Sequence, residues 1–71
     1  MWKTGYHEGY KYAMKHFDEP SQFGIGGWGR ISKLEISKDG KWLFNYDRGD
    51  DINELDEGGL ELYEYLIDTY N

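Results

Sequence analysis

Two histidines, His7 and His16, are the side chains of this chain best suited to acid–base chemistry near neutral pH. Neither belongs to a recognisable catalytic or metal-binding pattern, because the chain has no cysteine, no G-x-S-x-G elbow and no H-E-x-x-H pair. His7 is expected in a turn and His16 near the end of a strand, where surface histidines are common. We therefore expect no catalytic residue, no metal site and no cofactor, and a protein that is not an enzyme.

The stretch Gly-Ile-Gly-Gly-Trp-Gly at residues 24–29 matches G-x-G-x-x-G literally. A dinucleotide fingerprint needs a strand before it and a helix after it, whereas here a strand is expected to follow. A protein kinase would need further motifs that 71 residues cannot hold. The pattern favours a tight turn. The alternative is a small-ligand site, for example for a nucleotide signal, whose ligand-binding residues would be Gly24, Gly26, Gly27, Trp28 and Arg30.

Acidic residues are concentrated in the last third of the chain. The formal net charge is −6, but residues 1–46 carry +2 and residues 47–71 carry −8. This asymmetry argues against direct nucleic-acid binding, which needs clustered Lys and Arg, and favours a protein partner with a basic surface. The oxygen-rich segment 47–54 lacks the spacing of a calcium loop and is expected to be a polar connection.

Four acidic residues recur at helical spacing in this third. Steps of i, i+4, i+7 and i+11 place them on a stripe about 60° wide, with axial steps of ~4.5–6 Å that resemble the phosphate interval of a nucleic-acid strand. Such a stripe is either the ordinary solvated face of an amphipathic helix or a surface that imitates a nucleic acid and occupies a basic groove. With the neighbouring loop acids, the predicted partner-binding residues are Glu57, Glu61, Glu64, Asp68, Asp47, Asp50 and Asp51.

The elements that must position these residues begin with a C-terminal helix. Asp56 is its expected N-cap, and Gly58 and Gly59 should weaken its first turn by roughly 1 kcal/mol each relative to alanine. The helix should therefore depend on packing against a sheet. Its apolar stripe is expected to comprise Leu60, Tyr63, Ile67 and Tyr70, with Leu66 beside them.

Two β-hairpins precede the helix. A three-residue loop at 38–40, with Gly40 in the left-handed region, would pair Ile36 with Trp42 and Leu34 with Phe44. The face of that hairpin towards the core would then hold Ile36, Leu34, Trp42, Phe44 and Tyr46. A similar loop at 7–9 would pair Thr4 with Tyr12 and Trp2 with Met14, so that the first hairpin buries Trp2, Tyr6, Tyr10, Tyr12 and Met14.

These elements predict a single α+β domain spanning residues 1–71, a four-stranded antiparallel sheet of two hairpins with one C-terminal helix packed on it, ββββα. So small a domain has a limited core, and its 13 aromatic residues favour a homo-oligomer that covers the remaining rings. The chain has no apolar run of membrane-spanning length and no signal-peptide pattern, so we expect a cytoplasmic protein that does not bind membranes.

The runs Gly29-Arg30-Ile31-Ser32-Lys33-Leu34 and Asn45-Tyr46-Asp47-Arg48-Gly49, with a terminal Tyr70-Asn71, resemble a small uncharacterised family from phages and mobile elements of Gram-positive bacteria. Asp50 departs from that pattern, because the family tends to have tryptophan there. The resemblance implies a genomic setting and no activity.

Together these features favour a non-enzymatic binding protein, acting as a stoichiometric inhibitor of a host defence or nucleic-acid-handling enzyme in the manner of anti-CRISPR proteins. The alternatives are an oligomeric small-ligand binder and an accessory domain with a structural role.

Overall fold

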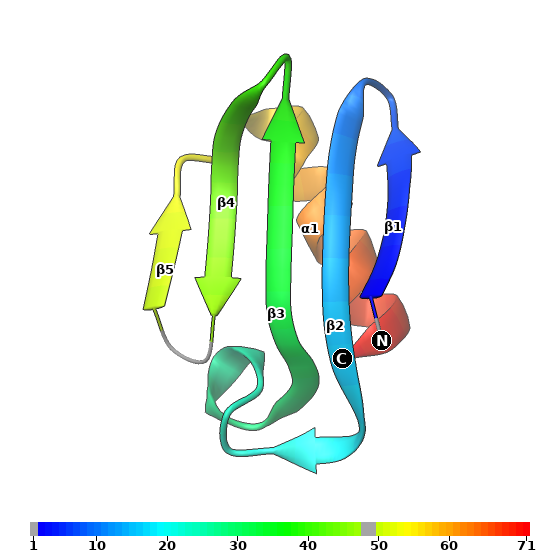
Figure 1. The fold of residues 1–71 in the computed structure, drawn as a ribbon, viewed down its shortest axis with the longest axis vertical. Helices are drawn as coiled ribbons and strands as arrows, with labels where there is room; N and C mark the ends of the chain where they lie inside the picture. The colour runs from blue at the N-terminus through cyan, green and yellow to red at the C-terminus, as the bar shows by residue number, and fades with distance from the viewer. Residues whose placement is uncertain (1, 48–49) are drawn as a thin grey trace.

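A five-stranded antiparallel sheet carries one helix on one of its faces (Figure 1). The computed structural model describes residues 2–47 and 50–71, and for residues 50–52 it describes the backbone alone. The expected four antiparallel strands and C-terminal helix are confirmed, and a short fifth strand occupies the expected polar connection. The elements are β1 (Trp2–His7), β2 (Tyr10–Ser21), the 3-10 helix η1 (Ile25–Gly27), β3 (Gly29–Lys38), β4 (Lys41–Asp47), β5 (Asp50–Asn53) and α1 (Glu57–Tyr70).

Both hairpins close through two-residue turns, so the predicted three-residue loops are wrong. The turn residues are Glu8 and Gly9 in the first hairpin and Asp39 and Gly40 in the second, and all four have φ between 50° and 88°. Positive φ at both central positions defines the type I′ turn, whose twist matches that of the flanking strands. The expected positive φ at Gly40 is confirmed.

The register predicted for the second hairpin is also wrong. Ile36 pairs with Phe44 and Leu34 with Tyr46, because a β-bulge inserts Leu43 between the Trp42 and Phe44 pairs. The extra residue restores the alternation that a two-residue turn would otherwise break. Ile36, Leu34 and Phe44 therefore still reach the core, whereas Trp42 does not and is 53% exposed.

The first hairpin differs from its predicted register by one residue. Lys3, not Trp2, pairs with Met14, and the partners of Trp2 and Tyr6 are lysines of β2. Tyr10 and Met14 are buried as expected, but Trp2 and Tyr6 are 46% and 77% exposed. Because the side-chain period of a strand is two, the shift moves both rings to the opposite face of the sheet.

The core lies between the sheet and α1. The helix contributes Leu62 and Leu66, whereas Leu60, which was expected on the buried stripe, is 45% exposed. Gly59 is buried too, and Tyr63, Ile67 and Tyr70 are half-buried against the core, so the buried face keeps most of the predicted stripe but is centred on Leu62 and Leu66. The buried apolar side chains are Tyr10, Met14, Ile25, Ile31, Leu34, Ile36, Leu43, Phe44, Leu62 and Leu66.

Candidate binding surfaces

The acidic stripe of α1 faces solvent. Glu57, Glu61, Glu64 and Asp68 are all exposed, and α1 contains no lysine or arginine. In the part of the chain that the structure describes, none of these four carboxylates lies within ion-pair distance of a cation. The helix therefore presents an uncompensated negative surface opposite the side that packs on the sheet.

The loop acids predicted to join this surface are placed differently. Asp47 is exposed at the end of β4, with its Oδ1 3.9 Å from Lys33 Nζ on the neighbouring strand. The side chains of Asp50 and Asp51 lie outside the described residues, as do Arg48 and Gly49. Among the described side chains, the structure thus brings together the four helix acids and places Asp47 on the sheet.

The first turn of α1 is tied to the sheet by a short hydrogen bond. Tyr10 donates its hydroxyl to Asp56 Oδ1 at 2.6 Å, and the same oxygen caps the helix by accepting from the Gly59 N–H at 2.8 Å. These two donors hold the pKa of Asp56 below its usual value, and the bond to Asp56 raises the pKa of Tyr10. A β-carbon on Gly58 would lie 2.7 Å from the Tyr10 hydroxyl, so the glycine that weakens the helix also allows this contact.

Residues 24–29, called the glycine-rich corner below, form a closed loop rather than an open ligand-binding loop. A β-carbon on Gly24 would overlap the Gly29 carbonyl group, so the two ends of the loop touch. Tyr46 donates its hydroxyl to the carbonyl oxygens of Phe23 and Gly24, at 3.2 and 3.1 Å. Gly26 and Gly27 both have φ of 86° and are exposed, as is Trp28.

The last residue of the chain fastens this corner to the helix. Asn71 accepts the Ile31 N–H through Oδ1 at 2.9 Å and donates Nδ2 to the Ile25 carbonyl at 3.4 Å. Its carboxamide occupies the space that a β-carbon on Gly29 would need. A structural role thus accounts for Gly24 and Gly29, and ligand binding by this loop stays a prediction.

The two histidines and Arg30 pack against neighbouring groups. His7 stacks on Tyr65 with ring centroids 6.4 Å apart, and His16 stacks on Tyr70 at 5.9 Å. Arg30 donates Nε to the Phe17 carbonyl at 3.1 Å, with Nη2 3.4 Å from His16 Nδ1. These contacts hold β2, β3 and the end of α1 together.

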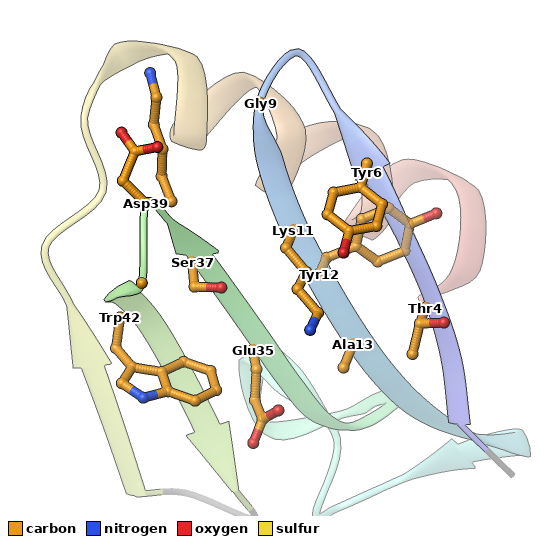
Figure 2. A pocket seen from close by; sticks show the side chains of 12 residues that line it. Thr4, Tyr6, Gly9, Lys11, Tyr12, Ala13, Glu35, Ser37, Asp39 and Trp42 are labelled. Atoms are coloured by element: carbon orange, nitrogen blue, oxygen red, sulfur yellow. The ribbon is translucent and has the colours of Figure 1, made fainter.

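Sequence reasoning missed a groove on the outer face of the sheet, the face opposite α1. The groove has a volume of about 660 Å³ and runs over the end of the sheet that carries the two tight turns. Tyr6 of β1 and Trp42 of β4 stand at its sides, with Lys11 of β2 and Glu35 of β3 between them (Figure 2). These residues come from four strands, so only the correct register of both hairpins could have revealed the groove.

No group of three or more His, Asp or Glu side chains among the described residues is placed to hold a metal ion. In the same residues, no helix has the length and apolar character needed to cross a membrane.

No curated protein and no solved structure is significantly similar to this chain. A family model, described as a domain of unknown function (DUF7678), matches residues 1–71. Since the match covers the whole sequence, the chain belongs to the DUF7678 family.

Proposed function

We propose that this protein is a non-enzymatic binding protein of phage or mobile-element origin that inhibits a host defence or nucleic-acid-handling enzyme stoichiometrically. Its partner would be a protein with a basic surface in the host cytoplasm. The observation that carries the proposal is the acidic face of α1, where four exposed carboxylates lie on one side of a helix without lysine or arginine.

Charge and rigidity both support a docking role for this face. The buried side of α1 packs on the sheet through Leu62 and Leu66, and its N-terminus is held by Asp56 and Tyr10. The carboxylates are therefore displayed from a fixed helix, so little backbone entropy is lost when a rigid basic groove binds them. Complementary charge also accelerates encounter and suppresses acidic competitors.

The experiment begins with a pull-down from the native host and measures affinity for the recovered protein. Glu61→Lys combined with Glu64→Lys should abolish binding while thermal stability changes little, because both side chains are exposed. The matched control is Glu19→Lys with Glu54→Lys, which makes the same change in net charge at exposed positions outside α1. It should weaken binding only slightly.

Salt provides a second test of the same proposal. Contacts between exposed charges are screened over about 8–10 Å at physiological ionic strength, so affinity should fall steeply as salt rises. If the double reversal in α1 binds as tightly as the wild type, or no more weakly than the control pair, the acidic face is not the docking surface.

A further inference from the structure

The outer face of the sheet differs in charge from the protein as a whole. Three lysines, Lys11, Lys15 and Lys33, lie at positions that alternate with the buried residues of β2 and β3. Among the described side chains, Lys33 is 3.9 Å from Asp47, and Glu35 and Asp39 line the groove, so Lys11 and Lys15 are the lysines of this face without an ion pair. Four of the acids that produce the net charge of −6 lie on α1 instead. The overall charge is therefore a poor guide to what this face can bind.

Aromatic rings and lysines are paired across the strands of this face. Tyr6 pairs with Lys11, and Trp2 pairs with Lys15. Directly opposed side chains in an antiparallel sheet stand about 5 Å apart, and the two pairs are separated by four residues, or about 13 Å. The face thus repeats one unit, an exposed ring beside an ammonium group.

A third ring completes the row that begins with Tyr6 and Lys11. Lys11 pairs with Ser37, and Ser37 pairs with Trp42 on the far side of the groove. The groove between the rings holds the small side chains of Ser37 and Ala13 beside the longer ones of Lys11 and Glu35 (Figure 2). Tyr6 and Trp42 are exposed, so a flat ligand can reach the face of each ring.

We propose that the outer face of the sheet binds single-stranded nucleic acid. Unpaired bases stack on Trp42, Tyr6 and Trp2, and the phosphates lie against Lys11 and Lys15. Exposed aromatic rings with interleaved cations are the combination that single-strand-binding surfaces use, since every base has a stacking face. A duplex keeps its bases stacked on each other, so its bases cannot occupy these rings. This site goes beyond the proposed function, because it lies on the face opposite the acidic helix.

Glu35 gives the proposed surface a preference among bases. Its carboxylate stands in the floor between Lys11 and Trp42 (Figure 2). A carboxylate accepts a hydrogen bond from an exocyclic amino group, as in the pairing of Glu or Asp with cytosine N4. Cytosine-containing strands should therefore bind more tightly than thymine-only strands, and Glu35→Gln should reduce that difference.

The test measures fluorescence anisotropy of a labelled single-stranded oligonucleotide of about 12 nucleotides, a length within the site sizes of known single-strand-binding folds. Trp42→Ala and Tyr6→Ala should each weaken binding about ten-fold, since loss of one stacked base costs roughly 1–3 kcal/mol. Lys11→Gln should weaken binding and make the slope of log affinity against log salt shallower by about 0.7.

The matched controls use residues of the same types away from this face. Trp28→Ala removes a tryptophan that is 68% exposed on the glycine-rich corner, and it should leave oligonucleotide affinity unchanged. The double reversal at Glu61 and Glu64 should not weaken oligonucleotide binding either, which separates this site from the proposed protein-docking face. Circular dichroism of each variant verifies that the fold is retained.

Several results would overturn the proposal. Absence of oligonucleotide binding at low salt would do so, as would equal losses for Trp42→Ala and Trp28→Ala. A mononucleotide that competes as well as the oligonucleotide would identify a small-ligand groove instead of a strand-binding face. Equal affinity for a duplex of the same sequence would show that stacking on these rings is not involved.

Discussion

The contact between Gly29 and Asn71 provides the sharpest test of how the helix is fastened to the sheet. Asn71 Oδ1 accepts the N–H of Ile31, whose side chain is fully buried, and its Nδ2 reaches the Ile25 carbonyl. Gly29→Ala should displace the Asn71 side chain, because the new β-carbon would stand 2.7 Å from Asn71 Cγ. Both side-chain hydrogen bonds of Asn71 would then be lost without any change at Asn71 itself.

The expected magnitude follows from the hydrogen bonds. Asn71→Ala leaves the Ile31 N–H without its acceptor, and an orphaned buried donor costs about 1–3 kcal/mol. Gly29→Ala should cost at least as much, because it breaks the same bonds and adds steric strain. Gly29→Ala combined with Asn71→Ala should cost about 1–2 kcal/mol less than the sum of the single changes, since the second change removes the group that the first displaces.

The assay is urea denaturation followed by tryptophan fluorescence and circular dichroism. A loss of 2 kcal/mol corresponds to a fall in melting temperature of roughly 8–16 °C in a domain of this size. Thr69→Ala, at an exposed position two residues before Asn71, serves as the control and should change stability by less than about 0.5 kcal/mol. Strictly additive losses in the double variant, or a Gly29→Ala variant as stable as the control, would refute the reasoning.

Gly40→Ala should destabilise the protein by roughly 1 kcal/mol in urea denaturation, because φ is 78° at that position, and an unchanged midpoint would contradict the turn assignment. Leu66→Ala should cost about 2–5 kcal/mol by the same measurement, since that side chain is fully buried, and a loss under 1 kcal/mol would mean that α1 packs differently. Tyr10→Phe should lower stability most between pH 4 and pH 10 and progressively less outside that window. Folding lowers the pKa of Asp56 from 3.8, so the stability that Asp56 contributes is present above pH 3.8 and is lost as pH falls through the folded pKa. Folding raises the pKa of Tyr10 from 10.0, so the stability that Tyr10 contributes is lost as pH rises through the folded pKa. A loss of stability in the variant that does not depend on pH would exclude this linkage. Sedimentation equilibrium should show a homodimer or larger assembly at high micromolar concentration, whereas a monomer mass would reject self-association.

Local signals in the sequence predicted those parts of the fold that local interactions determine. Asp56 was recognisable as an N-cap from its place before the helix, and positive φ at Gly40 follows from an Asp-Gly pair between two strand patterns. The acidic stripe of α1 was predictable for the same reason, since its members lie within three turns of one helix.

The strand registers were not predictable from the alternation of apolar and polar residues. Trp42, Leu43 and Phe44 are consecutive apolar residues, and the alternation does not show which of them is the extra residue of a bulge. The predicted three-residue loop at 38–40 therefore placed Trp42 on the wrong face of the sheet. The outer groove depends on the registers of both hairpins, so no single segment of the sequence predicts it. The contact between Gly29 and Asn71 joins residues that are far apart in sequence, so no local pattern predicts that contact either.

The order of the strands in the sheet has a consequence for how the chain folds. Every strand pairs with the strand next to it in sequence, and the tight turns place the partners of each hairpin within a few residues of each other. Such pairings close short loops, which form in microseconds and cost little chain entropy. The pairing of β2 with β3 joins residues as far apart as Lys11 and Ser37, and α1 and Asn71 make the contacts of still longer range. Each hairpin can therefore form from its turn outward, whereas the pairing of β2 with β3 and the docking of α1 must close longer loops, which costs more chain entropy.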